Sequence, residues 1–290
     1  MDFSRKRAAQ LLRGAARRLD PATSTAAPPP QLSAPAELAS RLAVPAEPGS
    51  RVISGFFDKY PRFYGTSRTA NVPDRLNARY DAIFAENADL FDGATVLDVA
   101  SHDGRWTLAA LATGARYVTG IEGRPDLVEN AERTLLEYGF GSDRVTFHSG
   151  DLFEVFARES FDVDVVLCLG FLYHTLRYHE LWEAMVDARP EHILLDTESP
   201  RVMLGGPPSV FVQQEASDSQ MNAIADAHAR GAKVLTGRPN LPAIRVMAAF
   251  YGYEVERLSN WPAIIRDNPG LRGIGNYANY TRVTVRLKRK

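Results

Sequence analysis

The sequence has little cysteine, almost no net charge and no long apolar run. Its 290 residues include one cysteine, Cys168, so a disulfide within the chain is excluded and a reducing, cytoplasmic compartment is expected. The net charge of -1 gives no global electrostatic argument for a nucleic-acid partner. No run reaches the ~18 apolar residues of a membrane-spanning helix, and the basic N-terminus lacks the apolar segment of a secretory signal. What is left is an ordinary globular composition, with 45% hydrophobic and 24% charged residues.

The first 50 residues differ in composition from the rest. Residues 1–20 are basic, with alanine and leucine at helical spacing, and residues 21–50 contain seven prolines. The basic segment fits either a helix on an anionic membrane surface or a soluble arm, and its weak, mostly alanine face favours the arm. We expect residues 1–50 to be a disordered arm and linker. We expect residues 51–92 to be a helical and aromatic extension, and residues 93–290 to be the main domain.

From residue 93 onward, apolar runs alternate with amphipathic segments. Strands are predicted at Thr95–Val99, Tyr117–Glu122, Val145–Ser149, Val163–Leu169, His192–Asp196, Tyr253–Leu258 and Arg282–Leu287. Helices are predicted at Asp74–Phe91, Arg105–Thr113, Pro125–Tyr138, Tyr178–Ala188, Asp218–Ala229 and Pro242–Tyr251. The alternation predicts an α/β fold, a Rossmann-like doubly wound and mostly parallel sheet with an N-terminal helical extension. The proline- and glycine-rich segment Ser199–Glu215 follows the fifth strand, and we expect a lid around 199–240.

The segment Thr95–Gly104, TVLDVASHDG, reads as a strand and a tight turn before a helix. Such a unit places a ligand against the N-terminus of the helix. Glu122 ends the next apolar run, where an acid is positioned to bind ribose hydroxyls. The three glycine positions of a dinucleotide turn are here Ala100, His102 and Gly104. Because two of them carry side chains, a pyrophosphate, and therefore NAD, is not expected.

Four motifs in order resemble the class I methyltransferases that depend on S-adenosylmethionine (SAM). VLDVASHDG is followed by GIEGRPD, SGDLF and FDVDVVLCLGFLYH, and the resemblance covers roughly Asp74–Pro200. It implies SAM as the cofactor and S-adenosylhomocysteine as the product. It also implies an antiparallel last strand beside the fifth, which Arg282–Leu287 would form. His102 and Asp103 depart from the GxGxG pattern of the family, so the role of His102 stays open.

The predicted cofactor site gathers residues at the ends of strands. Glu122 is expected to accept hydrogen bonds from the ribose diol, and Gly104 to allow close backbone approach. The resemblance implies that Asp151 contacts the adenine amine and that Leu152 contacts the ring, although Asp151 also fits a helix N-cap. The predicted cofactor-binding residues are Ala100, Ser101, His102, Gly104, Trp106, Glu122, Gly123, Asp151, Leu152, Cys168 and Leu169.

Methyl transfer to a hydroxyl needs alignment and a base. His174, in LGFLYHT, is the first candidate because histidine titrates near neutral pH. The alternative is a structural histidine bonded to a loop carbonyl. Asp196, in LLDTES, is the second catalytic candidate, and Glu198 follows it. Together these residues could also bind Mg²⁺, but that interpretation is not favoured and no metal site is predicted.

The sequence leaves three functions open. The favoured one is O-methylation of a small sugar, polyol or phenol in carbohydrate or secondary metabolism. A second is modification of the tRNA wobble uridine, because FDVDVVLCLGFLYHTL also resembles a motif of those enzymes, although a basic face is missing. A third is a SAM-binding scaffold without catalysis. A homodimer is compatible with all three.

Overall fold

The computed structural model describes residues 53–66, 72–200, 206–217, 224 and 226–290. The predicted arm at residues 1–50 lies outside the described residues. The 3-10 helices are η1 (Phe56–Lys59), η2 (Pro61–Tyr64), η4 (Ala85–Leu90) and η5 (Leu172–His174). The α-helices are α3 (Pro73–Ile83), α4 (Arg105–Thr113), α5 (Pro125–Glu137), α6 (Leu152–Arg158), α7 (Tyr178–Asp187), α8 (Leu241–Phe250), α9 (Trp261–Asp267) and α10 (Gly275–Ala278). None of the helices in this part of the chain is long and apolar enough to cross a membrane.

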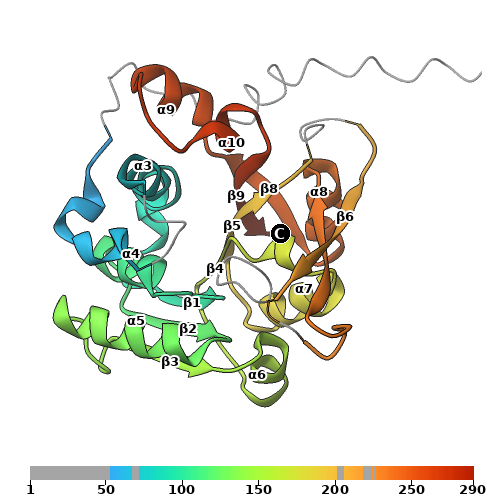
Figure 1. The fold of residues 1–290 in the computed structure, drawn as a ribbon, viewed down its shortest axis with the longest axis horizontal. Helices are drawn as coiled ribbons and strands as arrows, with labels where there is room; N and C mark the ends of the chain where they lie inside the picture. Colours follow the sequence, from blue (N-terminus) through green and yellow to red (C-terminus); the bar gives the residue numbers. More distant parts are fainter. Residues whose placement is uncertain (1–52, 67–71, 201–205, 218–223, 225) are drawn as a thin grey trace, which may run out of the picture. The chain divides into compact units, whose positions relative to one another are not determined.

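The strands form one large and one small sheet. They are β1 (Thr95–Val99), β2 (Tyr117–Glu122), β3 (Val145–Ser149), β4 (Val165–Leu169), β5 (His192–Glu198), β6 (Val210–Ala216), β7 (Lys233–Pro239), β8 (Tyr253–Leu258) and β9 (Arg282–Arg289). The large sheet has the order β3-β2-β1-β4-β5-β9-β8 (Figure 1). Its first five strands pair in parallel, and β9 runs antiparallel to both of its neighbours. The Rossmann-like fold and the antiparallel last strand beside the fifth are therefore confirmed.

The sheet is covered on both faces because its central strands are apolar on both sides. Leu97 and Val99 of β1 belong to one core with α6, α7 and α8. Val96, which directly precedes Leu97, belongs to a second core with α3, α4 and the aromatic residues of η1 and η2. Alternate residues of a strand point to opposite faces, so a near-continuous apolar run fills both cores. The N-terminal helical extension is thus one wall of the second core.

The predicted helix at Asp74–Phe91 is interrupted. The α-helix ends at Ile83, and η4 continues the segment with a non-helical residue, Asn87, at φ -123° and ψ 27°. The side-chain amide of Asn87 donates to the carbonyl of Ile83 over 2.8 Å. This bond satisfies a carbonyl at the helix end and accounts for the break, which periodicity alone did not indicate.

The segment after the fifth strand differs from its prediction in two places. Residues 226–229, predicted as the end of a helix, form a turn in which the amide of Ala229 bonds the carbonyl of Asp226 over 3.0 Å. Strands β6 and β7 pair antiparallel as a separate two-stranded sheet, which the sequence pattern does not indicate. Val210, Phe211 and Val212 are consecutive exposed apolar residues in β6, so the alternation that predicts a strand is missing. The lid itself stays a prediction.

Candidate functional site

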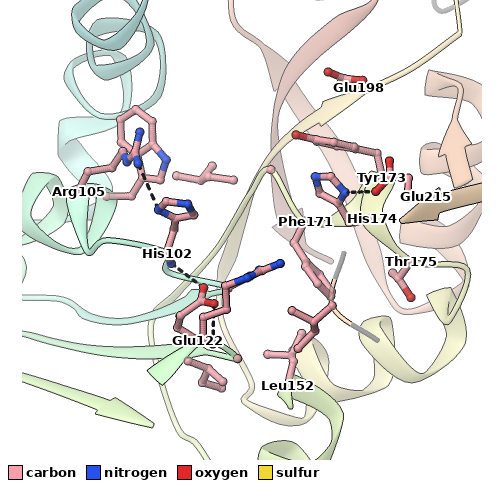
Figure 2. A pocket seen from close by; sticks show the side chains of 18 of the residues that line it. His102, Arg105, Glu122, Leu152, Phe171, Tyr173, His174, Thr175, Glu198 and Glu215 are labelled. Atoms are coloured by element: carbon pink, nitrogen blue, oxygen red, sulfur yellow. Dashed lines mark hydrogen bonds and ion pairs between the residues drawn. The ribbon is translucent and has the colours of Figure 1, made fainter. Parts of the chain in front are cut away.

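A cavity of about 540 Å³ lies at the carboxyl ends of β1, β2, β4 and β5. The strand order reverses between β1 and β4, and ligands of open α/β sheets bind at such a switch point. Figure 2 shows His102, Arg105 and Glu122 on one side of this cavity and Tyr173, His174, Glu198 and Glu215 on the other. The site therefore has two walls of different chemistry.

The turn after β1 has a left-handed backbone at alternate residues. Ala100 has φ 57°, His102 has φ 56° and Gly104 has φ 76°. Only glycine adopts this region without steric cost, so Ala100 and His102 store strain of about 1–2 kcal/mol each in the turn. Gly104 itself does not line the cavity. A Cβ at this position would lie 3.0 Å from Ala131 and Leu135 of α5, so the glycine permits the turn to pack against this helix, and its approach to a ligand stays a prediction.

The carboxylate of Glu122 joins this turn to the end of β2. Its Oε2 accepts from the amide of His102 over 2.9 Å, and its Oε1 accepts from the amide of Arg124 over 3.0 Å. Glu122 is buried and lines the cavity. Because each carboxylate oxygen has a further lone pair, the group is fixed in orientation and can still accept from a ligand diol.

An ion pair beneath the turn holds its shape. Arg105 donates to the two carboxylate oxygens of Asp103, from Nε over 2.6 Å and from Nη2 over 2.7 Å, and Thr66 donates to the same group. Burial alone would raise the pKa of Asp103, but the Arg105 charge and the His102 contact hold it well below its usual range. Arg105 also lies 3.2 Å from Nδ1 of His102. A guanidinium only donates, so in neutral His102 this nitrogen is the acceptor.

Asp151 begins α6 as its N-cap. Its Oδ1 accepts from the amides of Phe153 over 2.9 Å and Glu154 over 3.2 Å, so the capping interpretation is confirmed. Asp151 also lines the cavity beside apolar Leu152 and Phe171. A contact from Asp151 to adenine stays a prediction. Trp106, Gly123, Ala100 and Leu169 line the same cavity.

Two predicted cofactor residues lie behind the wall of the cavity. Ser101 is buried, and its amide bonds the carbonyl of Ile121 over 2.9 Å. Cys168 is fully buried in the core, where burial raises the pKa of its thiol to about 12. Neither is among the residues that line the cavity, so the structure places both behind the predicted cofactor site and not in it.

The second wall carries a histidine and carboxylate pair. Nδ1 of His174, at the end of η5, lies 2.8 Å from Oε2 of Glu215 on β6 (Figure 2). Because a carboxylate only accepts, Nδ1 donates and Nε2 keeps a lone pair that can take a proton. The alternative of a histidine bonded to a carbonyl is not what this structure shows. Glu215 was missed in the sequence, where it is one acid in a segment without a pattern.

The structure contradicts the prediction that Asp196 acts as a base. Asp196 is fully buried and does not line the cavity. Four side chains donate to its carboxylate: Arg282 over 2.6 Å, Thr284 over 2.7 Å, Tyr277 over 2.8 Å and Arg79 over 3.0 Å. Burial would raise its pKa, but the Arg282 and Arg79 charges hold it well below its usual range. Such a group anchors arginines and is a poor proton acceptor. Among the described residues, no group of three His, Cys, Asp or Glu side chains could hold a metal ion.

Residues 96–189 match a family model described as a methyltransferase domain. The match spans β1 to α7 and includes the turn, Glu122, Asp151 and His174. Residues 96–189 are therefore similar to a methyltransferase domain, and they lie in a Rossmann-like sheet. No curated protein has a significant match to the sequence.

Solved structures of methyltransferases are similar in fold to this chain. A putative S-adenosylmethionine-dependent methyltransferase from Listeria monocytogenes is 16% identical with a TM-score of 0.50, over 73% of this chain and 99% of that one. Magnesium protoporphyrin IX methyltransferase from Synechocystis, with bound S-adenosylhomocysteine, is 15% identical with a TM-score of 0.49, over 82% and 96%. The N-terminal domain of EvdMO1, in the presence of S-adenosylhomocysteine and D-fucose, is 21% identical with a TM-score of 0.47, over 75% and 82%. At these identities the comparison concerns the fold alone.

Within the matched segment, Asp98 of β1 is expected to make folding stability depend on pH. It is buried, and its Oδ2 accepts from the Thr107 hydroxyl over 2.7 Å. Burial raises the pKa of Asp98 to about 7, and the nearby Glu122 and Asp103 charges add to this. The folded chain thus holds a proton that the unfolded chain releases near pH 4, and this contribution to stability is lost as pH rises through 7.

Urea unfolding between pH 4 and 8 measures the effect. In Asp98→Asn, the loss of stability over this range should be smaller than in wild type by roughly 2–4 kcal/mol, at ~1.4 kcal/mol per pKa unit. Equal pH dependence in the two proteins would show that Asp98 titrates normally in the folded state.

Proposed function

We propose that this chain transfers a methyl group from SAM to a hydroxyl of a small acceptor. The observation that carries the proposal is that Glu122 and the His174–Glu215 pair open into the same cavity from opposite walls (Figure 2). One wall offers an acceptor for a ribose, and the other offers a base for a hydroxyl. A cavity of about 540 Å³ falls in the range of small-molecule sites.

The residues of the first wall fit SAM. Glu122 presents a fixed carboxylate to the ribose diol, and Leu152 and Phe171 give an apolar surface for adenine. The end of β4, at Leu169 and Gly170, lies in the same cavity where the methionine end would bind. When bound, SAM supplies a methyl group activated by its sulfonium.

The residues of the second wall fit general base catalysis. As the acceptor oxygen bonds to the methyl carbon and the carbon–sulfur bond breaks, Nε2 of His174 takes the hydroxyl proton. Glu215 holds the imidazole in the tautomer that leaves this nitrogen free, and its negative charge stabilises the imidazolium. The acceptor would be a sugar, a polyol or a phenol.

Removing the carboxylate of Glu122 should weaken SAM binding. Glu122→Ala is expected to cost ~1–3 kcal/mol of binding free energy, because the ribose diol loses its charged acceptor. Calorimetry with SAM and S-adenosylhomocysteine measures it, and wild type should not bind NAD. Glu129→Ala, on the exposed face of α5, is the matched control and should bind as wild type. Unchanged SAM affinity in folded Glu122→Ala would refute the ribose role.

The activity itself is tested with labelled SAM and panels of sugars, phenols and tRNA. Product from a sugar or phenol supports the proposal. Product from tRNA, with affinity that falls steeply with salt, would favour wobble-uridine chemistry. SAM binding without turnover on any acceptor would favour a scaffold. A cytoplasmic location, a homodimer, the predicted domain boundaries, the lid and membrane contact of residues 1–20 stay predictions.

A further inference from the structure

The acceptor side of the cavity carries more positive than negative charge. Arg75 and Arg79 of α3, Arg238 of β7 and Arg282 of β9 all line it. In the described residues, two carboxylates face these four guanidinium groups. Asp196 lies behind Arg79 and Arg282, and Glu198 contacts Arg238 over 3.0 Å and Arg282 over 3.7 Å.

The other acids of the cavity are engaged elsewhere. Glu215 pairs with His174, and Asp226 pairs with Arg177 over 3.3 Å. Glu122 accepts from backbone amides, and Asp151 caps α6. These four acids therefore leave the excess positive charge of the four arginines uncompensated.

Arg79 and Arg282 share one carboxylate. Both donate to the same oxygen, Oδ1 of Asp196, and their side chains are 7% and 4% exposed. Nε of Arg79 is buried without a hydrogen-bond partner in the described part of the chain. A buried guanidinium donor without an acceptor is costly, and a ligand oxyanion would satisfy it.

Arg75 has neutral partners in this structure. Its Nη1 donates to the carbonyl of Gly273 over 2.5 Å and to Oδ1 of Asn276 over 2.8 Å. Burial lowers the pKa of Arg75, and the neighbouring Arg79 and Arg282 charges lower it further, against raising effects of Tyr277 and Asp196. Arginine stays protonated under such shifts, so the charge is present and lacks a dedicated carboxylate in the described residues.

We propose that Arg75, Arg79, Arg238 and Arg282 form an oxyanion subsite that binds a carboxylate or phosphate of the methyl acceptor. The inference rests on the proposed function and narrows the acceptor to an acidic small molecule. Guanidinium groups bind such oxyanions through paired, charge-assisted hydrogen bonds.

The subsite adjoins His174, the proposed base. Nη1 of Arg282 donates to the Tyr173 hydroxyl over 3.3 Å, and the Tyr173 and His174 rings lie 4.2 Å apart. An acceptor anchored by its anion therefore keeps its hydroxyl within the part of the cavity that His174 reaches.

Binding of matched acid and neutral probes tests the subsite. The protein loaded with S-adenosylhomocysteine is titrated with D-glucuronate against D-glucose, 4-hydroxybenzoate against 4-hydroxybenzamide, and glucose 6-phosphate against glucose. Calorimetry and saturation-transfer NMR give the affinities. We expect the acids to bind about 10–100-fold tighter than their neutral partners, the effect of one charged hydrogen-bonded group. The glucuronate and phosphate arms show which oxyanion is preferred.

Variants of Arg75 distinguish the loss of its positive charge from a loss of folding. Arg75→Gln should lose most of the preference for acids, and Arg75→Lys should keep part of it, while S-adenosylhomocysteine affinity stays unchanged. Arg266→Gln, an exposed arginine paired with Asp267, is the control. Equal binding of acid and neutral probes by wild type, absence of binding by every acid, or an unchanged preference in folded Arg75→Gln would overturn the inference. Failure to bind S-adenosylhomocysteine would instead refute the proposed function, and the anion titration is then made on the unloaded protein.

Discussion

Replacing His174 by alanine is expected to lower turnover by ~10²–10⁴-fold, the usual contribution of a positioned general base. SAM affinity should stay near wild type, because His174 lies on the wall opposite Glu122 (Figure 2). A loss in turnover with unchanged cofactor binding is the signature of a group that acts in the transition state. Single-turnover rates with labelled SAM, once an acceptor is found, measure the effect.

Two variants sharpen this test. Glu215→Gln should lower turnover less than His174→Ala, since it removes the charge that orients the imidazole and leaves the imidazole itself in place. His179→Ala, an exposed histidine of α7, should keep wild-type turnover. A normal single-turnover rate in folded His174→Ala would show that the base is elsewhere, or that the acceptor is a nitrogen or an acidic phenol that needs none.

Replacing Asp196 by alanine is expected to destabilise the protein by about 3–5 kcal/mol, the cost of removing one partner of a buried ion pair. The change leaves the Arg79 and Arg282 charges buried without their shared acceptor. It also removes the carboxylate oxygen to which the Tyr277 and Thr284 hydroxyls donate. The free energy of unfolding in urea measures it. Asp196→Asn should cost less, because its amide oxygen can still accept.

Asp267→Ala is the matched control for this prediction. Its partner Arg266 is 68% exposed, so the pair should contribute less than about 1 kcal/mol. If Asp196→Ala has the unfolding free energy of wild type but no turnover, the structural role is contradicted. Asp196 would then again be a candidate for the base. The test therefore separates the two interpretations of one buried carboxylate.

The local patterns of the sequence predicted much of the fold. The strands at Thr95–Val99, Tyr117–Glu122, Val145–Ser149 and Tyr253–Leu258 have the predicted bounds. Each strand is a short run of apolar or alternating residues, so the signal that predicts it lies entirely in neighbouring residues. Glu122 was also found in this way, because its place at the end of β2 follows from the strand and turn before it.

Local patterns failed where a residue's surroundings come from distant segments. The sequence presents Asp196 and Glu215 as similar acids, but the first is enclosed by α3, α10 and β9 and the second contacts His174, 41 residues away. A Cβ at Gly104 would meet side chains of α5, a constraint that the local pattern of the turn does not reveal.

The sequence by itself determined the seven strands of the large sheet, the unusual turn after β1 and the candidate base His174. Only the tertiary structure decided that His174 has a carboxylate partner, that Asp196 is an anchor, and that arginines from α3, β7 and β9 converge on one wall. The physical reason is that the spacing of apolar residues within one segment reflects which face of that segment is buried. Charge, pKa and hydrogen bonding depend instead on which segments fold against each other.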